Sequence, residues 1–207
     1  AEILKHSLIL DKKFFMWLIK NGKRIVAERN KALLINAIFK SCKIKNTIVS
    51  KDEKERNLRM ILNFGHTFAH GFESAKNLSK KLNHGEAVLL GMIVASDLSN
   101  KKKLLSFKEL SLIKKHYKNL KLLMNIKKFF KKNEINKIVH FMKKDKKNIN
   151  NKINLILLKK IGRTTMPKEI SLKDSEIKNF LTSLLFIAKL FGLVVLPIFF
   201  KRIKFMF

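Results

Sequence analysis

Two short motifs hold most of the residues that could do chemistry. His66 and His70 lie in the segment Asn63–His70, and His84 opens a His-Gly-Glu motif, so three of the six histidines fall within 19 positions. A spacing of four residues places His66 and His70 on one helix face, a turn apart. Catalytic zinc sites commonly combine two histidines with a carboxylate and leave one coordination position open. The spacing therefore predicts a metal site that still lacks its carboxylate.

Helices must position these residues, because apolar residues recur at helical spacing along most of the chain. The pattern predicts helices over residues 2–10, 11–20, 25–39, 52–76, 87–98, 106–117 and 134–143, with a short connection at 46–50. The helix over 52–76 would carry His66 and His70, and His84 would open the next one. The third helix is expected to make core contacts through Ile25, Ala27, Ala32, Leu33 and Ile38.

The remaining part of the chain has a different pattern. Residues 152–158 are β-branched and alternate in polarity, which predicts a strand or hairpin near 152–166 in a mainly α, bundle-like fold. Residues 180–200 are apolar and long enough to span a bilayer, but they include Lys189, Gly192 and Pro197. This stretch is interpreted as a terminal helix packed on the core or as an extension from a degraded reading frame, with a membrane anchor as the alternative.

Composition excludes some classes of protein. The single cysteine, Cys42, excludes an internal disulfide framework and favours a cytoplasmic setting. The net charge of +31 would ordinarily indicate a nucleic-acid or membrane partner. However, only six of the 46 basic residues are arginine, and the lysines are spread over nearly every segment. The charge is therefore discounted, because nucleic-acid-binding proteins concentrate arginine and exposed aromatics on one face. A basic helical protein that binds nucleic acid or a membrane is kept as the alternative function.

Several separated motifs together resemble the 3-dehydroquinate synthase family. In chain order, they are Ala1-Glu2-Ile3-Leu4-Lys5, Lys45 with Asp52-Glu53-Lys54-Glu55, Arg59 with Leu62-Asn63-Phe64-Gly65-His66-Thr67, His70 with Glu73, His84-Gly85-Glu86-Ala87-Val88, and Asp145-Lys146-Lys147. The resemblance covers residues 1–161. It implies that residues 1–183 form the helical C-terminal domain of that enzyme, followed by an apolar and basic extension over 184–207.

The resemblance supplies the carboxylate that the spacing alone lacks. In the family, zinc is held by the glutamate of an Ala-Glu-x-x-Lys helix and by two histidines. These positions correspond to Glu2, His66 and His84 here. His70 is then assigned to proton transfer near the substrate phosphate, since an imidazole titrates near neutral pH. His6, His116, His140 and Glu86 fall outside the matched functional positions and are expected to be structural or exposed.

The resemblance also implies a substrate and a reaction. The substrate would be a phosphorylated sugar acid, 3-deoxy-arabino-heptulosonate 7-phosphate, which the family converts into 3-dehydroquinate and phosphate in the shikimate pathway. Cations and hydrogen-bonding groups around it would come from Lys5, Lys45, Glu55, Arg59, Asn63 and either Lys146 or Lys147. A different sugar-phosphate cyclase is the nearest enzymatic alternative, and Arg59 with Asn63 favours the dehydroquinate branch.

The cofactor NAD presents a mismatch. The family has a preceding nucleotide-binding domain, but the seven glycines of this chain are too dispersed for a Gly-x-Gly-x-x-Gly loop. We therefore expect a chain that lacks the N-terminal NAD-binding domain and is inactive alone. The resemblance also suggests a homodimer.

Overall fold

The protein is described by a computed structural model that covers residues 1–77, 82–144 and 152–193, with only the backbone given for 187–193. The helices and strands in chain order are α1 Glu2–Leu10, α2 Lys12–Val26, α3 Lys31–Lys51, η1 Leu58–Asn63, α4 His66–Ala75, α5 His84–Lys101, α6 Phe107–Asn119, η2 Ile126–Lys128, η3 Lys132–Glu134, α7 Ile135–Lys143, β1 Lys152–Leu155, β2 Leu158–Lys160, β3 Arg163–Thr164, β4 Ile170–Lys173 and α8 Asp174–Leu193. The mainly α fold class is confirmed.

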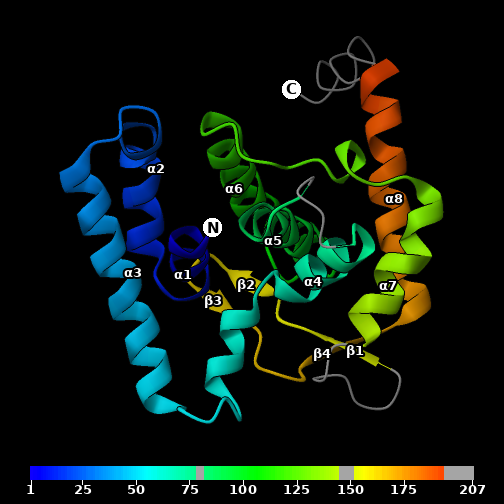
Figure 1. Ribbon diagram of the computed structural model, residues 1–207, viewed down its shortest axis with the longest axis horizontal. Coiled ribbons are helices and arrows are strands. Elements are labelled where there is room, and N and C mark those ends of the chain that lie inside the picture. Colours follow the sequence, from blue (N-terminus) through cyan, green and yellow to red (C-terminus); the bar gives the residue numbers. More distant parts are fainter. Residues whose placement is uncertain (78–81, 145–151, 194–207) are drawn as a thin grey trace, which may run out of the picture.

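The helices form two groups with α1 between them (Figure 1). On one side, α1 packs against α2 and α3. On the other side, α4 packs against α5 and α7, and α7 packs against α8. The N-terminus lies near the middle of the molecule (Figure 1), so the first residues of the chain reach the centre of one face.

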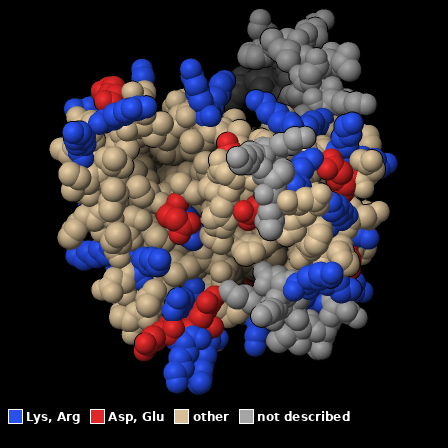
Figure 2. Space-filling model, viewed as in Figure 1, with Lys and Arg blue, Asp and Glu red and all other residues tan. Residues whose placement is uncertain are grey.

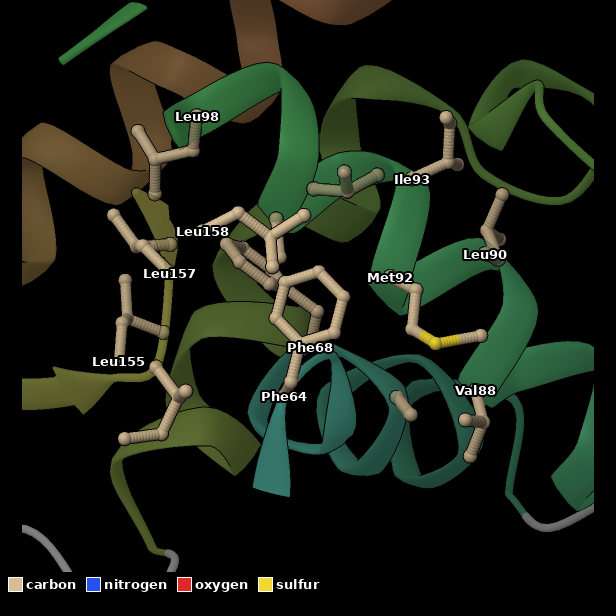
Figure 3. Close-up of a cluster of buried hydrophobic side chains, with 14 of the residues drawn as sticks. Phe64, Phe68, Val88, Leu90, Met92, Ile93, Leu98, Leu155, Leu157 and Leu158 are labelled. Carbon is tan, nitrogen blue, oxygen red and sulfur yellow. The ribbon is translucent and has the colours of Figure 1, made fainter. Parts of the chain in front are cut away.

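The core that supports this centre is aromatic and aliphatic. Phe64 and Phe68 are fully buried, and Figure 3 shows them facing Met92 of α5 and the residues Leu157 and Leu158 at the start of β2. Such close packing fixes α4 against α5 because any shift would open a cavity or create overlap. The start of α4 is therefore held in place by its own buried face.

The first helix and the start of the second agree with the sequence prediction, but α2 continues six residues beyond the expected end and the third helix differs. Asp11 caps α2, since its side chain accepts a hydrogen bond of 2.8 Å from the backbone N–H of Phe14. The predicted helix over 25–39 was wrong at both ends. Arg29 adopts a positive φ of 50° and Asn30 caps a new helix, α3, which continues to Lys51 and includes the expected connection at 46–50.

The expected core contacts of the third helix were also partly wrong. Ile25 packs against the core and Leu33 is half-buried, whereas Ala27, Ala32 and Ile38 are exposed. The buried stripe of α3 consists instead of Ala37, Ser41, Ile44 and Ile48. These residues are three or four positions apart, so a single face of α3 meets the rest of the molecule.

The single helix expected over 52–76 is divided into a loop, η1 and α4. The side chain of Asp52 accepts hydrogen bonds from the backbone N–H groups of Arg56, Asn57 and Arg59, at 2.8–2.9 Å. These bonds compete with the i to i−4 bonds that would continue a helix. Gly65 then ends η1 with a φ of 80°, which glycine adopts without strain.

The C-terminal part contains the predicted hairpin. Strands β2 and β3 pair antiparallel around Gly162, while β1 pairs with β4, which lies beyond the expected range. α8 follows β4 directly and runs without interruption across residue 183, where the C-terminal extension was expected to follow the domain. Within the residues that the structure describes, no helix is long and apolar enough to cross a membrane. Residues 194–200 of the apolar stretch lie outside that part.

Candidate metal and substrate site

Two glycines bring the histidine motifs together. A Cβ atom on Gly65 would lie 2.6 Å from the side chain of Met92, and a Cβ on Gly91 would overlap the carbonyl oxygen of Gly65. The backbones of α4 and α5 therefore approach more closely than any side chain would allow. Because His66 begins α4 and His84 begins α5, this contact places both imidazoles at one edge of the helix pair.

The start of α5 is fixed by a capping box. Asn83 accepts a hydrogen bond from the backbone N–H of Glu86, and the Glu86 carboxylate accepts one from the backbone N–H of Asn83, each at 3.0 Å. This reciprocal pair satisfies N–H groups that the helix leaves without intrahelical partners. Glu86 thus stabilises the start of α5, which agrees with the expectation that it is a structural residue.

The three histidines are neighbours but differ in exposure. The His66 ring lies 5.8 Å from the His84 ring and 6.0 Å from the His70 ring, measured between centroids. His66 is half-buried, whereas His70 and His84 are exposed. Burial, together with the Lys5 ammonium, lowers the pKa of His66 to about 4. This imidazole is therefore neutral at physiological pH, which is the state that binds a metal.

Glu2 completes the predicted set of metal donors. It is the first residue of α1, and with His66, His84, Ala1, Ile3, Gly85 and Val88 it lines an open cavity of about 450 Å³. Three elements that are distant in sequence thus place one carboxylate and two imidazoles around the same space.

The predicted metal donors contact other groups of the protein. Glu2 accepts a hydrogen bond from the Lys5 ammonium at 2.8 Å, and His84 Nδ1 lies 3.1 Å from both carboxylate oxygens of Glu73. In the described residues, no three histidine, cysteine or acidic side chains are already drawn together around a metal position. The contacts of His66 and His84 are made through Nδ1, which in His66 lies 3.4 Å from the Phe64 carbonyl oxygen, so Nε2 is the nitrogen expected to bind a metal in each ring. One carboxylate and two such nitrogens fit zinc.

A second cavity, of about 190 Å³, adjoins the first. It is lined by Glu2, Lys5, His6, Lys45, Glu55, Arg59, Leu62, Asn63 and His66. Five residues predicted to contact substrate are therefore brought together here: Lys5, Lys45, Glu55, Arg59 and Asn63. His70 does not line either of these two cavities. Lys146 and Lys147 lie outside the described residues.

One cation of this second cavity, Lys5, is deeply buried. The Lys5 side chain is only 4% exposed, and burial lowers its pKa although the Glu2 carboxylate opposes that effect. Burial also disfavours the Glu2 anion, but the hydrogen bond and charge of Lys5 outweigh it and lower the pKa of Glu2. A buried ammonium gains more from an anionic ligand than an exposed one does.

The segment from Asp52 to Asn63 arranges the remaining polar groups. Asn63 donates a hydrogen bond of 3.0 Å to the Glu55 carboxylate, and Arg59 donates one of 2.7 Å to the Glu53 carbonyl oxygen. Glu55 itself has a positive φ of 53°. The loop that interrupts the predicted helix is therefore the element that turns these side chains toward the cavity.

Three structural contributors were not predicted as site residues. Asp52 holds the loop, Glu73 contacts His84, and His6 lies buried in the second cavity with its Nδ1 2.7 Å from Ser41 Oγ. The available signal for His6 was its spacing of four residues from Glu2 on one helix. Glu73 belonged to the motifs that carry the family resemblance, but its contact with His84 was not predicted, because it arises from the packing of α4 against α5.

Comparison with known proteins identifies the family. The model of the 3-dehydroquinate synthase C-terminal domain matches residues 1–148. The chain belongs to the 3-dehydroquinate synthase family. A 3-dehydroquinate synthase from Pelagibacter ubique is 53% identical over 162 residues, which are 78% of this chain and 44% of the relative. The one from Dictyoglomus turgidum is 38% identical over 174 residues, 84% of this chain and 47% of the relative. The chain thus spans about half the length of these relatives.

Solved structures show the same fold. A 2-epi-5-epi-valiolone synthase from Streptomyces hygroscopicus, with NAD+ and Zn2+ bound, aligns with a TM-score of 0.72 at 23% identity, over 88% of this chain and 49% of that one. A 2-deoxy-scyllo-inosose synthase, in complex with carbaglucose-6-phosphate, NAD+ and Co2+, aligns with a TM-score of 0.65 at 23% identity over the same shares. The architecture is therefore that of the sugar-phosphate cyclases.

Proposed function

We propose that this chain supplies the metal-binding and substrate-binding part of a 3-dehydroquinate synthase. That enzyme would be a carbon-oxygen lyase that converts 3-deoxy-arabino-heptulosonate 7-phosphate into 3-dehydroquinate and phosphate. The observation that carries the proposal is the shared boundary of the two cavities, since both Glu2 and His66 line each of them. A ligand in the cationic cavity would therefore lie beside the predicted metal donors.

Glu2, His66 and His84 would hold the metal ion. When bound, zinc would make a coordinated substrate hydroxyl more acidic, and NAD would accept the hydride from the same carbon. The contribution of this chain is the donor geometry, which depends on the contact between α4 and α5 and on the buried face of α1. Binding of NAD would require residues other than those predicted to bind the metal and the substrate.

The second cavity would orient the substrate. Lys5, Lys45 and Arg59 supply positive charge for a phosphate and a carboxylate, while Asn63, held by Glu55, supplies an amide for a hydroxyl group. Because these groups are positioned by α1, α3 and the loop before η1, they would align the substrate without a large rearrangement. His70 would exchange a proton near the phosphate, from the exposed side of α4.

Substrate specificity separates this proposal from its nearest alternative. The two solved structures are a 2-epi-5-epi-valiolone synthase and a 2-deoxy-scyllo-inosose synthase, but at 23% identity they support only the fold. The relative with 53% identity is a 3-dehydroquinate synthase, which supports the dehydroquinate branch. The family resemblance also supports a homodimer, and the single cysteine supports a cytoplasmic setting, as parts of the proposal.

Metal binding offers the direct test. Purified chain is expected to bind about one zinc ion, with affinity reduced at least about 100-fold in Glu2→Ala, His66→Ala and His84→Ala, because each removes one of the protein donors. His140→Ala, which removes an exposed histidine of α7, should bind zinc like the wild type. A correctly folded wild-type chain without zinc affinity would refute the proposed metal site.

Catalysis can be tested in a chimera. Joined to the N-terminal half of the Pelagibacter ubique relative, the chain is expected to release phosphate from 3-deoxy-arabino-heptulosonate 7-phosphate. Arg59→Met in the chimera should lower kcat/KM by about 100-fold or more, because a cation that pairs with the substrate is lost. Arg24→Met, which alters an exposed arginine of α2, is the matched control. Equal rates in both variants would contradict the role of Arg59.

A further inference from the structure

His6 lies directly behind Glu2, one turn further along α1. The side chain is almost fully enclosed, with 3% of the residue exposed. Its Nδ1 atom lies 2.7 Å from the hydroxyl oxygen of Ser41 on α3. Its Nε2 atom is buried and, within the part of the chain that the structure describes, has no hydrogen-bond partner. A buried polar atom in this condition is uncommon, because its lost hydration is not replaced.

The surroundings of Nε2 indicate which partner it could serve. It lies 3.8 Å from Glu2 Oε2, slightly beyond hydrogen-bonding distance, and that oxygen now accepts its bond from Lys5. The charged groups that act on His6 are Lys5, Glu2 and Lys45. The imidazole therefore faces the only carboxylate among these three groups.

The proton of this imidazole can be assigned from its contacts. A neutral imidazole carries one N–H, on either Nδ1 or Nε2. The Ser41 hydroxyl can donate to Nδ1, which leaves the proton on Nε2. The chain of bonds would then run from the Ser41 hydroxyl through the imidazole toward the carboxylate.

We propose that Ser41 and His6 position Glu2 for metal binding, with His6 Nε2–H donating to the carboxylate oxygen that the metal leaves free. This inference rests on the proposed function, in which Lys5 turns from Glu2 to the anionic substrate. The carboxylate then needs another donor, and the enclosed Nε2 lies 3.8 Å from it and has no hydrogen-bond partner among the described residues. Groups that hold a metal ligand from behind fix its orientation and strengthen metal binding.

Two amide substitutions separate the two ring nitrogens. In His6→Gln, the amide nitrogen can occupy the place of Nε2 and still donate to Glu2. In His6→Asn, the shorter amide reaches Ser41 but has no donor near the carboxylate. Zinc affinity, measured by competition with a chromophoric chelator, is expected to fall about 10–100-fold in His6→Asn and to stay within about threefold of wild type in His6→Gln.

His116→Asn is the matched control, because His116 is also a buried histidine with a pKa lowered to about 4, but it lines an apolar pocket. Its zinc affinity should equal that of the wild type. Loss of affinity in all three variants would show a general effect of instability and would overturn the inference. Wild-type affinity in His6→Asn would overturn it as well, while the metal site itself would stand.

The wild-type chain provides a measurement that needs no substitution. Nitrogen-15 NMR of the zinc-loaded protein is expected to show His6 protonated at Nε2 and unprotonated at Nδ1. The opposite tautomer would overturn the inference, because Nε2 could then only accept a bond. A wild-type chain that binds no zinc would overturn both this inference and the proposed function. Wild-type zinc affinity in His6→Asn would overturn only the inference, so the two failures are distinguishable.

Discussion

The side chains of the candidate site contact one another, and a bound ligand could replace some of these contacts. Lys5 donates a hydrogen bond to the Glu2 carboxylate, which would bind the metal. The Glu73 carboxylate contacts His84 at Nδ1, whereas Nε2 is the nitrogen expected to bind the metal. Binding would thus replace the Lys5 bond while preserving the Glu73 contact. At the residue scale, function depends on which of these contacts remain when a ligand binds.

Glu73 is expected to strengthen the metal site without touching the ion. Glu73→Ala should weaken zinc binding by about 10–100-fold, because His84 loses the carboxylate that orients its ring. Chelator competition on the purified chain measures the change. Glu53→Ala removes an exposed carboxylate of the neighbouring loop and should have no effect. Equal affinity in the Glu73 variant would show that the His84 ring is oriented by other contacts.

At the scale of elements, the sequence predicted the helices with clear local signals. Asp11, Asn83 and Ser106 each cap the helix that follows, and the corresponding starts of α2, α5 and α6 agree with the pattern within a few residues. The breaks at Arg29 and Gly65 were missed because apolar periodicity continues through both. A positive φ at either position depends on tertiary contacts that a periodic pattern does not record.

The same distinction explains how much of the site was predictable. The residue types of Glu2, His66 and His84 indicated a metal site once the family motifs were matched, although their roles stay predictions. Asp52, Glu73 and His6 were not predicted, because their contacts depend on a loop, a helix crossing and a buried face. Local spacing reveals donors on one helix but does not reveal what supports them from another.

The crossing of α4 and α5 should tolerate no side chain at Gly91. Gly91→Ala is expected to lower the free energy of unfolding by about 3 kcal/mol, because the new methyl group would overlap the Gly65 carbonyl oxygen. Urea unfolding measures the loss. Gly85→Ala is the control on the same helix, since its nearest atom would lie at an ordinary 3.6 Å. Equal stability of both variants would refute the close contact.

The loop before η1 should depend on a single carboxylate. Asp52→Ala removes the acceptor of three backbone N–H groups, so the amides of Arg56, Asn57 and Arg59 are expected to exchange with solvent at least about tenfold faster. Hydrogen exchange at residue resolution detects the change. Glu53→Ala should leave these rates unaltered. Unchanged exchange in Asp52→Ala would mean that other contacts hold the loop.

At the scale of the whole molecule, the mainly α architecture followed from composition and periodicity, whereas the meeting of α1, α3, α4 and α5 at one site did not. Figure 2 shows lysine and arginine side chains distributed over the visible face, most of them toward its margin. This distribution agrees with a dispersed compositional excess of lysine. Lys5 differs from that surface population because it is buried and donates to the Glu2 carboxylate.

Acid should destabilise the metal-free protein through its buried histidines. His116 has a pKa lowered to about 4 by burial, so the unfolded chain binds a proton between pH 6.5 and 4 that the folded chain rejects. Stability therefore falls as pH decreases through this window. The loss between pH 7 and pH 5 is expected to be about 2 kcal/mol smaller in His116→Phe than in wild type.

Urea unfolding in the presence of a chelator, at both pH values, measures this difference. His140→Phe is the control, because His140 is exposed on α7. If the His116 and His140 variants lose the same stability on acidification, burial of His116 does not contribute to acid sensitivity.

The contact of Gly65 with Gly91 has a consequence for how this sequence can evolve. The backbone contact between these glycines fixes the histidine motifs relative to each other. Their relative placement therefore depends little on which apolar side chains fill the surrounding core. Replacement of leucine or arginine by isoleucine, phenylalanine or lysine elsewhere can then accumulate under a biased mutational supply without displacing His66 from His84. We expect drift to be strongly constrained at these two glycines and much freer in the lysine-rich surface around them.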